Sequence, residues 1–288
     1  MKITELDGKC KIEKYDGYDT CVTLPDKVEE KPLAVIGAKA FLSCRTVERL
    51  ELSGTVECIG DWAFAHMKNL QEIIIPAKKI NFGKKVFLGC NNLKRVSLSQ
   101  TEEIYEGIPY LFASMVIYME EHPIEPEIAG DSKRQWEWLR DYDKSLMKFL
   151  EREDTYGFEP AFIGWFNVED VDDQKDAYMT ERKKCKIHLC LQRLLYNEKL
   201  GQEAERMLAN YLINANSLLA ELFTEPESVY GKDVRHYKLW QRIGGFEVIS
   251  PKEWLIRLQD ADPEVRAYLM ECQLSEKSGE DFFGELEL

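Results

Sequence analysis

The sequence carries an internal repeat with a period of 23 residues, and this repeat constrains the fold more than any other feature. Three segments align without gaps over residues 36–52, 59–75 and 82–98. Eight columns keep their character in all three copies, and these are Ile36/Ile59/Phe82, Gly37/Gly60/Gly83, Ala40/Ala63/Val86, Phe41/Phe64/Phe87, Cys44/Met67/Cys90, Val47/Leu70/Leu93, Leu50/Ile73/Val96 and Leu52/Ile75/Leu98. Agreement at eight columns indicates a structural unit that is repeated along the chain.

The spacing within one repeat predicts a short strand followed by a turn. The last two apolar columns lie two residues apart, which is the period of a strand with one buried face. The Phe column and the Cys or Met column lie three apart, as on a short helical turn. One such coil cannot bury its apolar face alone, so we expect the coils to stack into a solenoid with a parallel sheet.

The repeated pattern of Ile-Gly, Ala-Phe, Cys, Asn-Leu and a short strand resembles the BspA-like class of leucine-rich repeats, which occurs in bacterial proteins and often in surface proteins. Residues 8–100 share this resemblance. Three upstream segments look like the lead-in to the first full repeat of that class, namely Tyr15-Asp16-Gly17, Val22-Thr23-Leu24-Pro25 and Lys31-Pro32-Leu33-Ala34-Val35-Ile36-Gly37. The chain departs from the pattern by an insertion between Leu24 and Ile36 and by loss of the repeat after Leu98.

The eight cysteines do not form a dense disulfide framework in a chain of 288 residues. Cys44 and Cys90 share a column but lie two coils apart. Because stacked coils are about 4.8 Å apart, these two residues are separated by roughly 10 Å, which exceeds the reach of a disulfide. We expect free thiols that pack as small apolar side chains.

The stacking also predicts which side chains point outward from the sheet. Two rows of residues form its exposed face, and they are Arg49/Glu72/Arg95 and Glu51/Ile74/Ser97. The charges alternate in the first row, so one interpretation is a solvated sheet with cross-strand pairing. The other is a surface that binds a partner protein, as solenoids often do. These six residues are the candidate binding site.

Charge divides the chain near residue 100. Residues 1–100 hold 16 basic and 13 acidic side chains, and the remainder holds 22 basic and 39 acidic ones. We therefore predict a leucine-rich-repeat domain over residues 1–105 and a second domain over residues 106–288. An acidic surface repels phosphate backbones and anionic lipids, so we expect no nucleic-acid partner and no membrane partner. The longest apolar stretch, Leu111–Met119, is about half the ~20 residues that a spanning helix needs.

After Leu111 the apolar spacing changes to three and four, which predicts helices over residues 136–150, 177–199 and 202–223. Start signals for two further helices occur at Ser250-Pro251-Lys252-Glu253 and at Asp262-Pro263-Glu264, and Gly244-Gly245 is typical of a helix end. The second domain is thus expected to be all-α, either a bundle or an ankyrin-like helix stack. The whole chain is predicted to be an α+β protein, a solenoid followed by helices.

Two clusters could in principle bind a metal, and neither has the required geometry. The acidic residues Asp170, Asp172, Asp176 and Glu181 occupy positions 1, 3, 7 and 12 of an EF-hand-like loop, but position 6 is Lys175 instead of glycine. Cys185, His188 and Cys190 would spread over a helix, with the two cysteines about 140° apart. We expect no metal and no cofactor.

No motif for catalysis was found in the sequence. None of the four histidines accompanies a serine elbow, a reactive-cysteine motif or an HExxH motif, and there is no glycine-rich phosphate loop. We therefore expect a non-catalytic protein that binds another protein or acts as a scaffold. One alternative is an enzyme or accessory subunit with a small-molecule site in the helical domain, near the aromatic cluster of residues 156–166.

A second alternative is a surface adhesin. The chain begins Met-Lys-Ile-Thr-Glu-Leu-Asp, without the apolar segment of a secretory leader. This start predicts a cytoplasmic protein, and an extracellular one if a leader has been removed.

Overall fold

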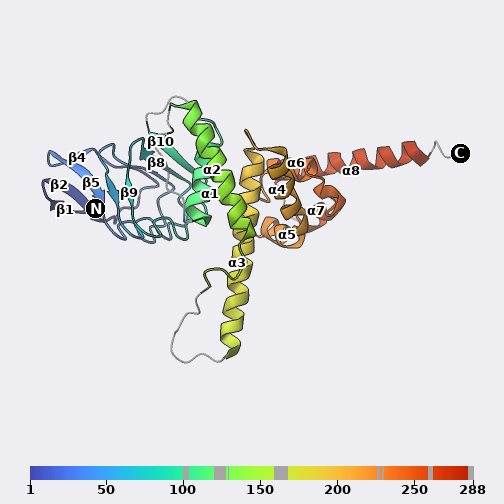
Figure 1. The fold of residues 1–288 in the computed structure, drawn as a ribbon, viewed down its shortest axis with the longest axis horizontal. Coiled ribbons are helices and arrows are strands. Elements are labelled where there is room, and N and C mark those ends of the chain that lie inside the picture. Colours follow the sequence, from blue (N-terminus) through green and yellow to red (C-terminus); the bar gives the residue numbers. More distant parts are fainter. Residues whose placement is uncertain are drawn as a thin grey trace. The chain divides into compact units, whose positions relative to one another are not determined.

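The computed structural model describes residues 1–99, 104–119, 128, 130–158, 168–225, 228, 230–258 and 262–284. The chain divides into two compact units, Met1–Glu151 and Arg152–Leu288. Figure 1 shows that the first unit holds the strands and that the second is helical. The predicted fold class, a repeat solenoid followed by helices, is confirmed.

The solenoid in the first unit has two sheets. One is a parallel sheet in the order β10-β8-β6-β3, formed by β3 (Cys21–Thr23), β6 (Arg49–Glu51), β8 (Glu72–Pro76) and β10 (Arg95–Ser99). Leu50 pairs with Ile73 and Ile73 with Val96, so the register is the one that the 23-residue period predicts. This is the parallel sheet expected from the sequence.

A second sheet was not expected from the sequence. Its order is β1-β2-β5-β7-β9, with β4 beside β5, and its strands are β1 (Lys2–Leu6), β2 (Lys9–Lys14), β4 (Lys27–Val28), β5 (Lys31–Ile36), β7 (Cys58–Ile59) and β9 (Asn81–Phe82). The residues of the column Ile36, Ile59 and Phe82 pair with one another across neighbouring strands of this sheet. The hairpin of β4 and β5 also accounts for the insertion after Leu24.

Tight turns connect the two sheets on one side of each coil, and they are in register with one another. Phe41 N–H donates to Ala63 O over 2.7 Å, and Phe64 N–H donates to Val86 O over 3.1 Å. Each turn holds two residues with positive φ, and these are Lys39 and Ser43, Trp62 and His66, and Lys85 and Gly89. The backbone conformation therefore repeats with the sequence, although five of these six residues are not glycine.

The matched columns of the repeat make the same contact in every coil. The rings of Tyr15, Phe41, Phe64 and Phe87 form a ladder with centroid separations of 4.9, 5.6 and 5.5 Å. The glycine column allows neighbouring coils to approach, because a Cβ at Gly60 would lie 2.5 Å from the backbone nitrogen of Ala38. Steric limits thus explain why this column holds glycine.

Polar side chains also join neighbouring coils. Asn69 donates a hydrogen bond to the carbonyl oxygen of Arg45 over 2.6 Å, and Asn92 donates to that of Lys68 over 2.7 Å. The thiol of Cys90 donates to the carbonyl oxygen of Phe64 over 3.0 Å, and burial raises its pKa to about 11. All eight cysteines are free thiols, as the spacing predicts.

Two helices complete the first unit, α1 (Ile108–Tyr118) and α2 (Ser132–Glu151). Helix α1 lies against β10, where the guanidinium of Arg95 stands 5.4 Å from the ring centre of Tyr110. The two helices pack through Phe112 and Trp138, whose ring centres are 4.8 Å apart. The boundary predicted between residues 105 and 106 lies between the last strand, β10, and the first helix, α1. That residues 1–105 form a separate domain stays a prediction.

The second unit consists of α3 (Val168–Leu195), α4 (Gln202–Asn214), α5 (Asn216–Thr224), α6 (Val234–Arg242), the 3-10 helix η2 (Gly245–Glu247), α7 (Pro251–Arg257) and α8 (Pro263–Gly284). Helix α3 contacts α4, α5 and α6, while α8 contacts α6 and α7. The helix predicted over residues 202–223 is divided at Ala215. The predicted start at Ser250 forms a complete capping box, and Gly244 follows α6 with a φ of 81°.

The core of the second unit is an aromatic cluster. The ring of Phe223 lies 5.4 Å from Trp254, 5.6 Å from Tyr237 and 5.8 Å from His236. Trp254 and Tyr237 are fully buried. Helices α5, α6 and α7 are thus held together by rings that come from different helices, and none of these contacts repeats.

Candidate functional site

The exposed face of the sheet β10-β8-β6-β3, which we call the strand face, carries all six residues predicted as a binding site. Its register places Arg49 beside Glu72 and Glu72 beside Arg95 in one row. In the second row, Glu51 pairs with Ile74 and Ile74 with Ser97. The sequence-predicted rows are therefore real neighbours in the structure.

Strand β3 adds one residue to each row, and neither of these two residues was predicted from the sequence. Cys21 pairs with Arg49, and Thr23 pairs with Glu51. Because of the insertion after Leu24, Thr23 and Glu51 are 28 residues apart instead of 23, so a search at the fixed period misses them. The alternation of apolar and polar residues in Val22-Thr23-Leu24 is the sequence signal that could have identified this strand.

The charges of the strand face are paired with one another. The carboxylate of Glu72 lies 3.4 Å from the guanidinium of Arg49 and 3.9 Å from that of Arg95. The hydroxyl of Ser97 donates a hydrogen bond to the same carboxylate over 3.1 Å. Three side chains thus converge on Glu72, which fixes their directions on the surface.

One apolar residue stands among these polar side chains. Ile74 is half-buried at the centre of the second row, between Glu51 and Ser97 on the neighbouring strands. Thr23 and Glu51 approach to 3.5 Å at the end of the row. The face therefore has an aliphatic centre surrounded by oriented polar groups, an arrangement found at protein interfaces.

The repeated coils match a known type of repeat. Residues 12–118 match the BspA type leucine rich repeat region, in six copies. These residues are a BspA-type leucine-rich-repeat region. The BspA-type region begins in β2 and ends with α1, so it extends beyond the three gapless copies found by alignment of the chain with itself.

Two solved structures are similar to part of this chain. One is a leucine rich cell surface protein from Faecalibacterium prausnitzii, with 21% identity, 34% of this chain and 29% of that chain covered, and a TM-score of 0.29. The other is a leucine rich repeat protein from T. pallidum, with 21% identity, 34% and 61% coverage and a TM-score of 0.27. The chain thus covers less than two thirds of either protein. No curated protein matches the sequence.

The candidate metal residues lie outside the BspA-type region, on one continuous helix. Asp172, Asp176 and Glu181 belong to α3, so they do not form a loop, and the side chain of Asp170 lies outside the described residues. Within the described part of the chain, no group of three or more His, Cys, Asp or Glu side chains could hold a metal ion. Cys190 is fully buried on the same helix, and His188 hydrogen-bonds Tyr230 instead.

The aromatic cluster of the alternative small-molecule site falls mostly on residues 159–167, which lie outside the described residues. Two of its members are described, and both contact Tyr178. Tyr178 donates a hydrogen bond to the carbonyl oxygen of Tyr156 over 2.7 Å, and its ring lies 5.5 Å from that of Phe158. These contacts hold the chain against α3.

His236 is a buried polar residue that the sequence did not single out. Neither ring nitrogen has a hydrogen-bond partner among the described residues, and burial lowers the pKa of the imidazole to about 4. Its neighbours are the rings of Phe223 and Tyr230. His236 is therefore a neutral part of the aromatic core at pH 7.

In the described residues, no helix is long and apolar enough to span a membrane.

Proposed function

We propose that the chain is a non-catalytic interaction protein and that the strand face of its BspA-type region binds a partner protein. The observation that carries this proposal is Ile74, an aliphatic side chain that stands at the centre of an ordered polar surface. Solenoids present such surfaces to proteins, because parallel strands give a continuous and rigid platform.

The paired charges favour this function because they preorganise the surface. Arg49 and Arg95 are held by Glu72, so they lose less rotational freedom when a partner binds. A partner that fits this face inserts an apolar group over Ile74 and offers hydrogen-bonding groups to Glu51 and Ser97. The absence of reactive motifs in the sequence supports a binding role over an enzymatic one.

The location of the protein stays a prediction from the sequence. The binding surface proposed here applies equally to a surface adhesin, since it depends on the solenoid alone.

The test compares two substitutions of the same kind on opposite sheets. Ile74→Arg places a charge at the centre of the strand face. Val35→Arg is the matched control, because Val35 is also a half-buried aliphatic residue on a central strand, but in the other sheet. Thermal unfolding of both variants checks that the fold is kept.

The immobilised wild-type chain and the two variants are incubated with a protein extract of the source organism, and bound proteins are identified by mass spectrometry. We expect one protein to be captured by the wild type and by Val35→Arg and to be lost with Ile74→Arg. Equal capture by all three chains, or no specific capture by the wild type, would contradict binding through the strand face.

A further inference from the structure

The side of the solenoid formed by the turns has a different charge pattern from the strand face. We call the exposed side chains of the turns at residues 38–45, 61–68 and 84–91 the turn face. It carries five cations, which are Lys39, Arg45, Lys68, Lys84 and Lys85. The three segments contain one acidic side chain, Asp61. Its carboxylate accepts a hydrogen bond from the backbone N–H of Lys84 over 2.7 Å.

Among the described residues, the cations of the turn face have no carboxylate partner. Within the described residues, none of the five takes part in an ion pair, whereas both arginines of the strand face do. Stacked coils are about 4.8 Å apart, so the five charges repel one another across three neighbouring coils. Such a surface attracts an acidic partner.

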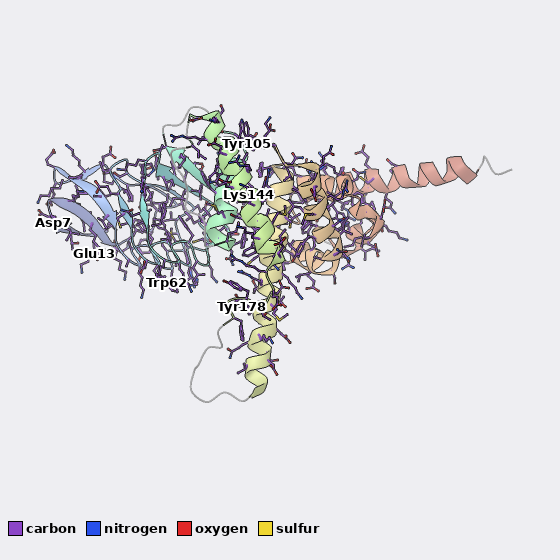
Figure 2. All side chains as sticks on the ribbon, viewed as in Figure 1. Asp7, Glu13, Trp62, Tyr105, Lys144 and Tyr178 are labelled. Atoms are coloured by element: carbon purple, nitrogen blue, oxygen red, sulfur yellow. The ribbon has the colours of Figure 1, made fainter. Side chains whose placement is uncertain are left out.

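The turn face also has an apolar strip between its cations. Leu42 is 39% exposed and Leu88 is half-buried, whereas Ala65, which occupies the same column of the turns, is fully buried. Trp62 lies in the next column, where the ammonium of Lys85 stands 5.7 Å from its ring centre. Figure 2 labels Trp62 at the lower edge of the solenoid. An apolar strip with a cationic rim fits an amphipathic helix that has an acidic rim.

The second unit of the chain contains a helix of this kind. On α8, Met270 is 44% exposed and Leu274 is 67% exposed, and together with Ala267, Glu271 and Ser275 they line a shallow groove. Their spacing of three and four places them on one helix face. Among its described side chains, α8 carries the exposed carboxylates of Glu264 and Glu271. In Figure 1, the C-terminal half of α8 extends past the other helices of its unit.

We propose that α8 of a second copy of the chain docks on the turn face. The two surfaces are complementary in charge, and both have an apolar strip. Their repeats also agree, because the coils are spaced about 4.8 Å apart and successive turns of an α-helix rise about 5.4 Å. Ala267, Met270 and Leu274 can therefore face three coils in succession.

This contact joins two different surfaces, so a docked pair still offers one free turn face, on one copy, and one free α8, on the other. The association is head to tail and grows with concentration. The surface is small, which makes the association weak and reversible. The proposal does not depend on the strand face, so the two proposals can fail separately.

The first experiment is sedimentation velocity of the full chain at several concentrations in 0.1 M salt. We expect the weight-average mass to rise above the 33.6 kDa of one chain as the concentration increases. Raising the salt to 1 M shortens the screening length from about 10 to about 3 Å, and the mass is expected to fall toward that of one chain.

The second experiment exchanges the charges of the two surfaces. One variant carries Lys84→Glu and Lys85→Glu on the turn face, and the other carries Glu264→Lys and Glu271→Lys on α8. Each variant alone brings like charges together, so its association is expected to weaken by roughly tenfold or more. An equimolar mixture restores association, because the reversed turn face of one variant fits the reversed helix of the other.

The apolar part of the contact is tested by Leu274→Ser. The side chain is mostly exposed, so the fold is kept while the association weakens. A wild-type chain that stays monomeric at all concentrations would overturn the proposal. Docking of α8 on the turn face of its own chain would also give a monomer, so it would overturn the proposal too. Association that persists in both charge variants, or a mixture that does not associate, would overturn it as well.

Discussion

The two units of this chain are stabilised in different ways. In the solenoid, one contact is made again in each coil, as the aromatic ladder from Tyr15 to Phe87 shows. In the helical unit, each buried contact occurs once. The ammonium of Lys186 is buried and lies 2.8 Å from Asp154, and Arg193 is fully buried beside the carbonyl oxygen of Glu198.

This difference teaches where each unit is sensitive. A ladder distributes its stability over equivalent positions, and loss of one member affects the coils on both sides. A buried ionisable group has no equivalent elsewhere in its unit. Its contribution to the unfolding free energy depends on its protonation state and therefore on the pH. The predictions below test this comparison in order of decreasing effect.

Phe64→Ala has the largest expected effect, about 3–5 kcal/mol of lost unfolding free energy. The ring of Phe64 contacts both Phe41 and Phe87, so its removal leaves a cavity that three coils share. Urea unfolding measures the loss. Leu42→Ala is the control, because this side chain is 39% exposed on the turn side of the neighbouring coil and should change stability by less than about 1 kcal/mol. Equal losses in the two variants would contradict the ladder.

Acid is expected to destabilise the helical unit through His236. Its pKa is lowered to about 4 in the fold by burial, against an ordinary value near 6.5 in the unfolded chain. Between these values the unfolded chain binds a proton that the folded chain does not, so stability falls as the pH decreases from about 6.5 to 4. The full loss is about 3 kcal/mol. Burial likewise lowers the pKa of His188, to about 3, with the same sign.

The measurement is the unfolding free energy of wild type and His236→Phe between pH 4 and 7. Phenylalanine keeps a ring among Phe223 and Tyr230 and cannot be protonated. Since carboxylates titrate in both chains, the difference between the two curves isolates His236. Parallel curves would show that the imidazole is not buried as a neutral group.

Asn92→Ala is expected to cost about 1 kcal/mol. The substitution removes the hydrogen bond to the carbonyl oxygen of Lys68 on the preceding coil. The neighbouring Asn91 is exposed, so Asn91→Ala is a control of the same kind and should have almost no effect. Chemical unfolding of the two variants distinguishes a ladder bond from a general preference for asparagine at this turn.

Glu72→Gln has the smallest expected effect on stability, below about 1 kcal/mol, because it removes surface ion pairs with Arg49 and Arg95. The difference from wild type should shrink further in 1 M salt. Unfolding curves at low and high salt check both statements. A loss of several kcal/mol would mean that the strand face stabilises the solenoid instead of serving a partner.

The sequence predicts the sheet of β6, β8 and β10 and the turns that follow the repeat, because every coil supplies an independent sample of the same pattern. It predicts the outward rows for the same reason. The sheet that contains β7 escapes prediction because a strand of two residues, Cys58–Ile59, is too short to show alternation. Cys21 and Thr23 escape because the insertion changes their distance to the next coil.

The helical unit is predictable in its elements and not in its packing. Local signals are sufficient at Ser250 and Gly244, since capping and positive φ depend on the neighbouring residues alone. The break at Ala215 is missed because the apolar spacing continues from Leu212 to Leu219 across it. The position of His236 among aromatic rings depends on three helices that no local pattern connects.

The identical register of the coils has a consequence for the history of such genes. A duplication or deletion of one 23-residue segment adds or removes one member of each column and leaves every other contact intact. The β1–β2 hairpin and helix α1 close the solenoid at its ends and do not depend on the number of coils between them. The length of the protein, and with it the area of both faces, can therefore change between relatives without a new fold.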